Sequence, residues 1–136
     1  MPKPRISKSM PQHAPRKRPD MDSRHLANVR QIDCVMCGAS YVYSGTHPHH
    51  LLRTGEQTNQ KSGGRTSADK WAIPLCPTCH RGLHDLGDEE GYLAAAGIDG
   101  RALAQALWGA RGDLEAMRRV AFRANQEARL KLRPNA

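Results

Sequence analysis

Apolar and polar positions follow a helical period in the last third of the chain. The apolar residues there are separated by three and four positions, at Leu114, Met117, Ala121, Ala124 and Ala128. This spacing predicts an amphipathic helix from residue 114 to about residue 131 that packs through its apolar stripe. Asp113 would cap this helix, and its arginines would form the solvated side, at Arg118, Arg119, Arg123 and Arg129.

Shorter helices are predicted from caps and from the spacing of apolar residues. Asp88 precedes a predicted helix over 89–96, and Asp99 precedes a second one near 100–109. Aspartate is a favoured N-cap because its side chain accepts a hydrogen bond from the first turn of the helix. A short helix or turn is also expected within 21–33, where apolar residues recur about one helical turn apart.

The middle of the chain contains short apolar runs of strand length. A strand is expected at 41–43, and an extended segment over 46–52. The run 71–75 is predicted to be an edge strand or a strand end because it contains a proline. Residues 77–86 should form a helix, since a proline stands at its first position, where proline is well tolerated. The expected order is therefore strand, loop, strand and helix.

Two segments lack apolar periodicity, and they carry much of the charge. Residues 1–20 contain five prolines and almost no large apolar side chains, so we expect a disordered arm. Residues 53–70 are polar and read as a long loop. The formal net charge is +8, and six basic residues and one acid place +5 of it in the arm. This distribution suits a polyanionic partner, although a merely solubilising tail would look the same.

Length and composition exclude several classes of protein. The 136 residues suffice for one domain, which would span 21–136. Only 38% of residues are hydrophobic, so packing alone is not expected to hold the fold together. No apolar run approaches the roughly 20 residues of a transmembrane helix, and the N-terminus has no apolar signal segment. We therefore expect no membrane association and a cytoplasmic location, where thiols stay reduced.

The four cysteines form two pairs, each with two residues between its members. The pairs are Cys34 with Cys37 and Cys76 with Cys79, and 38 residues separate them. In a reducing compartment this pattern is typical of a structural zinc site with four thiolate ligands. Two redox motifs or four unrelated thiols are the alternatives. A zinc ion would supply the stability that the small core lacks.

Five of the histidines lie near the cysteine pairs. His80 and His84 are four positions apart on the predicted helix and would project from one face, although two surface histidines would show the same spacing. His49 and His50 lie in the extended segment and would point to opposite sides, so one could bind a metal and the other act as a base. His47 could be a loop residue, a phosphate contact or a further metal ligand.

These motifs together resemble those of the HNH endonucleases with a zinc-knuckle ββα-metal core. The resemblance covers about residues 30–86, with a looser likeness from 97 to 108, and it is strongest to the phage and prophage subgroup of Ref-type RecA-dependent nucleases. It is carried by both cysteine pairs, the double histidine, the Gly63-Gly64 pair, the run Ile73-Pro74-Leu75-Cys76 and the ending Cys79-His80-x-x-x-His84.

The resemblance implies a small α+β fold, a ββα-metal core with a structural zinc on the four cysteines, followed by C-terminal helices over 88–132. It implies a metal-dependent endonuclease that hydrolyses DNA phosphodiester bonds. His49, His80 and His84 would hold a second, catalytic ion (Mg²⁺, Mn²⁺, Ni²⁺ or Zn²⁺), and His50 would be the general base. Many members carry asparagine five residues before the third cysteine, where this chain has Trp71, and Asp69, two residues earlier, is the nearest polar substitute for it.

The basic residues of the long loop would contact DNA phosphates, at Arg53, Lys61, Arg65 and Lys70. A recombination or packaging protein could direct such a nuclease to its substrate. Two other functions fit the sequence: a zinc module that binds nucleic acid without cutting it, and an adaptor that binds proteins through the C-terminal helices. The sequence does not indicate an oligomeric state.

Overall fold

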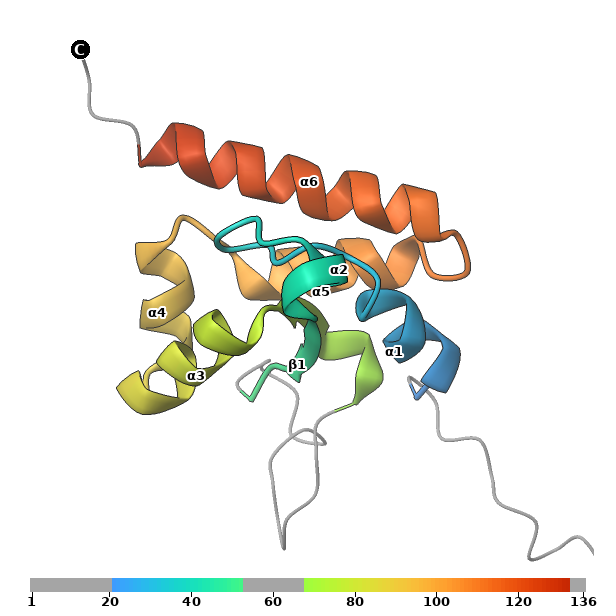
Figure 1. Ribbon diagram of the computed structural model, residues 1–136, viewed down its shortest axis with the longest axis horizontal. Helices are drawn as coiled ribbons and strands as arrows, with labels where there is room; N and C mark the ends of the chain where they lie inside the picture. The colour runs from blue at the N-terminus through green and yellow to red at the C-terminus, as the bar shows by residue number, and fades with distance from the viewer. Residues whose placement is uncertain (1–20, 53–67, 133–136) are drawn as a thin grey trace, which may run out of the picture.

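The computed structural model describes residues 21–52 and 68–132, and it is a small α+β fold. The arm over 1–20 and three of the expected DNA contacts, Arg53, Lys61 and Arg65, lie outside the described residues. The elements follow the chain in this order (Figure 1): α1 (Ser23–Val29), α2 (Tyr41–Ser44), β1 (His47–His50), the 3-10 turn η3 (Asp69–Trp71), β2 (Ala72–Leu75), α3 (Pro77–Leu86), α4 (Glu89–Ala95), α5 (Gly100–Gly109) and α6 (Leu114–Lys131).

β1 and β2 form a two-stranded antiparallel sheet in the described part of the chain. His47 pairs with Leu75 at one end of the sheet, and His50 pairs with Ala72 at the other. Every residue of β2 is buried, whereas β1 exposes His47 and buries His49. The strand predictions for 46–52 and 71–75 are confirmed, and the sheet brings the double histidine beside the segment that leads into the second cysteine pair.

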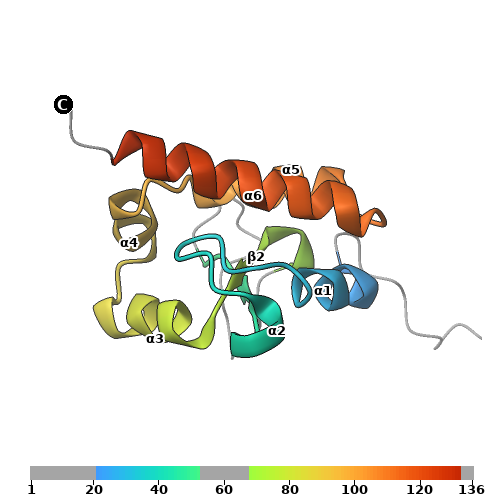
Figure 2. The same cartoon turned by 45° about the horizontal axis from the view of Figure 1, so that its top comes forward.

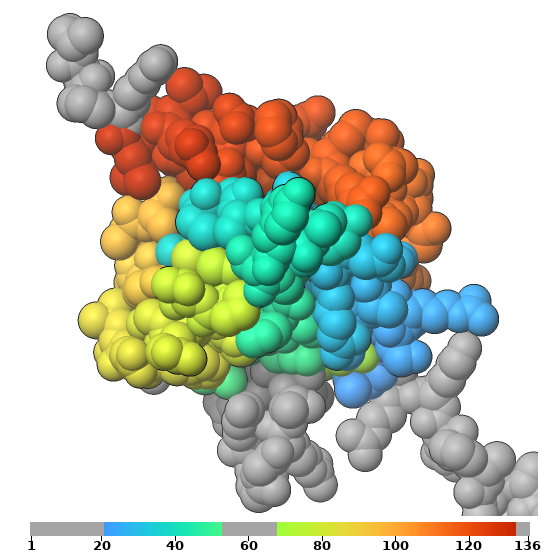
Figure 3. Space-filling view, viewed as in Figure 1, coloured from blue at the N-terminus to red at the C-terminus, as the bar shows by residue number. Residues whose placement is uncertain are grey.

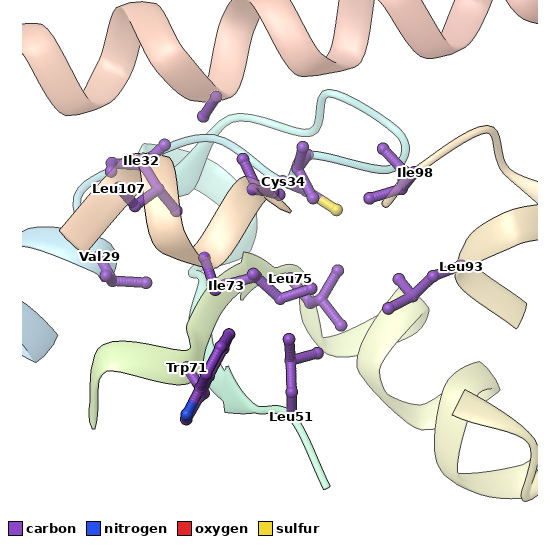
Figure 4. Close-up of a cluster of buried hydrophobic side chains, with 14 of the residues drawn as sticks. Val29, Ile32, Cys34, Leu51, Trp71, Ile73, Leu75, Leu93, Ile98 and Leu107 are labelled. Carbon is purple, nitrogen blue, oxygen red and sulfur yellow. The ribbon is translucent and has the colours of Figure 1, made fainter. Parts of the chain in front are cut away.

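The core lies between the sheet and α5 and continues between α5 and α6. α5 packs against β2 and η3, and α6 packs on the other side of α5 (Figures 1 and 2). Figure 4 shows Ile73 and Leu75 of β2 below Leu107 of α5, with Trp71 and Leu51 at the edge of the cluster. Burial of these side chains fixes the position of β2, and β2 in turn fixes the start of α3.

The predicted helices are confirmed, and aspartate side chains cap them. Asp88, Asp99 and Asp113 each accept a hydrogen bond from a backbone N–H in the first turn of α4, α5 and α6. α3 spans the predicted residues 77–86, with its proline at the start. None of the helices in the described part of the chain combines the length and apolar character needed to cross a bilayer.

The strand prediction for 41–43 is wrong, because this segment forms the short helix α2. The Ser40 side chain accepts a hydrogen bond from the Val42 N–H, and Gly45 ends the turn at φ +75°, a conformation that favours glycine. Val42 and Tyr43 are exposed, and α2 lies on the surface in Figure 3 (teal). The apolar side chains of this run therefore do not belong to a sheet.

α6 holds the first cysteine pair as well as packing on α5. Met117, Ala121 and Ala128 of the predicted stripe are buried. Asn125 is buried among them, and its Nδ2 donates hydrogen bonds to the carbonyl oxygens of Val35 and Met36, the two residues between the cysteines. The amphipathic pattern predicted the packing face but not this polar anchor.

The arginines of α6 are only partly the solvated side that the sequence predicted. Arg118 donates to the Gln31 carbonyl and to the Tyr41 hydroxyl, and Arg129 donates to the Cys37 carbonyl. Arg119 and Arg123 are exposed. The helix therefore uses two of its arginines to fasten the chain on either side of the first cysteine pair.

Candidate metal centres

The four cysteine sulfurs come together as a tetrathiolate cluster. One sulfur from each of Cys34, Cys37, Cys76 and Cys79 lies within 4.8 Å of the others. The Cys37 and Cys76 sulfurs are 3.6 Å apart. A tetrahedral zinc site with Zn–S bonds of about 2.3 Å has sulfurs about 3.8 Å apart, so the arrangement fits this ion.

Local backbone structure presents each pair to the other. The Val35 N–H donates to the Pro74 carbonyl, which ties the first pair to β2. Cys76 is the N-cap of α3, and its sulfur accepts a hydrogen bond from the Cys79 N–H. The two cysteine pairs therefore meet because the first is hydrogen-bonded to β2 and the second directly follows β2 in the chain.

Each of these thiols changes the pKa of its neighbours. Burial raises the pKa of the Cys79 thiol, and the charge of Cys34 raises it further. Burial, together with neighbouring cysteines, also raises the pKa of Cys37. Four sulfurs at this spacing cannot all ionise without a cation among them, and a divalent metal ion supplies that charge.

Three histidines form a second cluster, as the sequence predicted. One ring nitrogen from each of His49, His80 and His84 lies within 4.8 Å of the others. The Nε2 atoms of His80 and His84 are 3.0 Å apart. Metal–nitrogen bonds of about 2.1 Å place neighbouring ligands roughly 3.0–3.4 Å apart, so the spacing suits a shared ion.

The electrostatics of this cluster also suit a cation. Burial, together with the neighbouring imidazoles of His49, His84 and His47, lowers the pKa of His80 to about 4. His80 is therefore neutral at neutral pH, with a lone pair available. Neutral imidazole is the form that binds transition metals.

Glu89 is a site residue that the sequence did not reveal. Its Oε1 lies 2.7 Å from Nε2 of His49, and both of its carboxylate oxygens accept the Leu52 N–H. A proton on Nε2 of His49 leaves the lone pair on Nδ1, the nitrogen that could then bind an ion. A carboxylate behind a ligating histidine fixes the ring and increases its basicity.

The position of Glu89 explains why it was missed. It is the first residue of α4, directly after the Asp88 cap, where an acidic residue is common for reasons of helix stability alone. It also lies in the C-terminal extension, outside the predicted core of 30–86. Its burial is the feature that marks it, and burial is not visible in a single sequence.

The Glu89→Gln variant should bind the second metal ion about 10- to 100-fold more weakly, because the neutral amide no longer supports His49. Isothermal titration of Mn²⁺ into the zinc-loaded protein measures this affinity. Glu90→Gln, at the exposed neighbouring position, is the matched control and should bind Mn²⁺ like the wild type. Equal affinities for the two variants would show that Glu89 has no role at the cluster.

His50 lies on the other side of β1 from His49 and has a different partner. Its Nε2 is 2.9 Å from Oδ1 of Asp69, and the second oxygen of Asp69 accepts the Asp22 N–H at 2.8 Å. Asp69 is buried, whereas His50 is partly exposed. The structure thus brings Asp69, the expected substitute for the asparagine, into contact with His50.

This contact favours one tautomer of a neutral His50 ring. With its proton on Nε2 and donated to Asp69, the ring has its lone pair on Nδ1. Nδ1 makes no hydrogen bond to any residue that the structure describes. A partly exposed imidazole nitrogen that is held in one tautomer by a buried carboxylate is suited to accept a proton.

The remaining predicted residues divide between the second cluster and the surface. Nδ1 of His47 lies 3.2 Å from Nδ1 of His80. The Lys70 ammonium lies 5.4 Å from the centre of the Trp71 ring, at the end of the loop.

No family model matches the chain, and neither the curated proteins nor the solved structures include a significant match to it.

Proposed function

We propose that the protein is a metal-dependent endonuclease that hydrolyses DNA phosphodiester bonds, built on the ββα-metal core of the HNH enzymes. One observation carries the proposal: nitrogens of His49, His80 and His84 converge within 4.8 Å, while His50, the next residue along, is held separately by a carboxylate. A structural histidine cluster would not need an oriented base beside it. A strand, strand and helix supply these groups in the order that the motif resemblance implies.

His49, His80 and His84 are the residues that would hold the second ion. A divalent ion held there would polarise the phosphodiester and would stabilise negative charge on the leaving oxygen. His50 accepts a proton from the attacking water through Nδ1, and Asp69 holds the ring and stabilises the imidazolium that results. A zinc ion on the four cysteines would have no part in the reaction and would hold the two halves of the site together.

DNA is proposed as the substrate because of charge and of the site's chemistry. The chain carries a formal net charge of +8, with much of the excess in residues 1–20. Basic side chains bind the phosphate backbone without reading the sequence of bases, and such binding weakens with salt. This role is assigned to basic residues of the chain between β1 and β2, at Arg53, Lys61, Arg65 and Lys70.

Incubation of supercoiled plasmid with the zinc-loaded protein tests the proposal. Nicked or linear plasmid is expected with at least one of Mg²⁺, Mn²⁺, Ni²⁺ and Zn²⁺, and intact plasmid is expected when no second metal is added. A folded protein that binds DNA but leaves plasmid intact with every metal would instead be a zinc module without catalytic activity. Weak contact with DNA that does not respond to salt would favour the protein-binding adaptor.

A further inference from the structure

His47 contacts the histidine cluster without belonging to it. Its Nδ1 lies 3.2 Å from Nδ1 of His80, and the two rings meet edge to face at 73°. The three nitrogens that gather within 4.8 Å come from His49, His80 and His84. His47 is the first residue of β1 and is exposed. The proposed function gives this imidazole no role.

The two nitrogens of His80 face different partners. Nε2 lies 3.0 Å from Nε2 of His84, another member of the cluster. Nδ1 faces His47. If Nε2 offers its lone pair to an ion, a neutral His80 must carry its proton on Nδ1. That proton then points at Nδ1 of His47, which accepts it.

The backbone keeps His47 in place for this contact. The residue pairs with Leu75 in the sheet, and Pro48 follows it. A residue before proline is restricted to extended conformations, which lowers the freedom of the His47 backbone. The backbone that carries the acceptor is therefore restrained before any ion binds.

We propose that His47 is a positioning residue for the second metal ion: it accepts the Nδ1–H of His80 and so fixes the ring and tautomer through which Nε2 of His80 binds the ion. This inference rests on the proposed function, because it assumes that the cluster binds a metal. Partners that hydrogen-bond to a ligating histidine commonly affect metal affinity by about 10- to 100-fold.

Two substitutions at this position separate hydrogen bonding from packing. His47→Leu removes the acceptor, and Mn²⁺ affinity of the zinc-loaded protein should fall about 10- to 100-fold in isothermal titration. His47→Asn puts an oxygen at nearly the same place as Nδ1, and its affinity should return to within a few-fold of the wild type. Thr78→Ala, at an exposed position of α3, is the control for a change on the same surface.

The titration is carried out without DNA, so the two proposals fail in different ways. If the wild type binds no second ion, the metal site of the proposed function is wrong. If the wild type binds Mn²⁺ and His47→Leu binds it equally well, only the role of His47 is overturned. Equal losses in His47→Asn and His47→Leu also overturn it, since they would show that an acceptor at this position does not support His80.

Discussion

His50→Ala should reduce plasmid nicking by about 10²- to 10⁴-fold, the range that a positioned general base contributes. The variant keeps the three-histidine cluster, because His50 lies on the opposite side of β1 from His49 and contacts Asp69 instead. Metal binding and DNA affinity should therefore be nearly unchanged. Nicking rates under the best metal, together with Mn²⁺ titration and a DNA-binding assay, measure the three quantities.

The control for this experiment is Tyr43→Ala, at a strongly exposed position of α2. It should cut plasmid at the wild-type rate. A His50→Ala protein that also cuts at the wild-type rate would reject His50 as the base. A variant that no longer binds Mn²⁺ would show that His50 supports the metal site and that the two roles are not separate.

Removal of the zinc should unfold the domain. Structural zinc contributes about 10–16 kcal/mol in zinc-finger peptides, which is as large as the roughly 5–15 kcal/mol that stabilises a typical domain. Cys34→Ser, at a buried ligand position, should therefore lose most of its helical circular dichroism, as the wild type should after stringent chelation. Added Zn²⁺ should restore the signal of the chelated wild type.

His84→Ala is the matched control, because it removes a ligand of the second cluster and leaves all four thiols. It should keep its helical signal and its cooperative thermal transition while it loses Mn²⁺ affinity. Unchanged circular dichroism of the wild type after complete metal removal would contradict a structural role for the tetrathiolate site.

The parts of the fold that depend on local signals were predictable from the sequence. A proline at the start of α3 and aspartate caps before α4, α5 and α6 act within one helical turn, so a single sequence displays them. The convergence of His80 and His84 followed from their spacing of four residues. That spacing is also local, and it holds once the helix is known.

The parts that depend on contacts between distant segments were not predictable. The error at 41–43 is an exception, because it concerns local signals: the run has the side chains of a strand, but Ser40 and Gly45 close a helical turn around it. Glu89 reaches His49 across 40 positions of sequence, and Asn125 reaches Val35 across 90. The sequence suggested Asp69 only through its nearness to the expected asparagine, and the register of the sheet brings it to His50.

The central claim is that histidines from β1 and α3 surround one ion, separate from the zinc. Crystals of the zinc-loaded protein soaked in Mn²⁺ test it directly through anomalous scattering. The account predicts a manganese peak at bonding distance from nitrogens of His49, His80 and His84, together with a zinc peak among the four sulfurs. A fully soaked crystal with no manganese peak at these histidines, or with the ion bound by other residues, would contradict it.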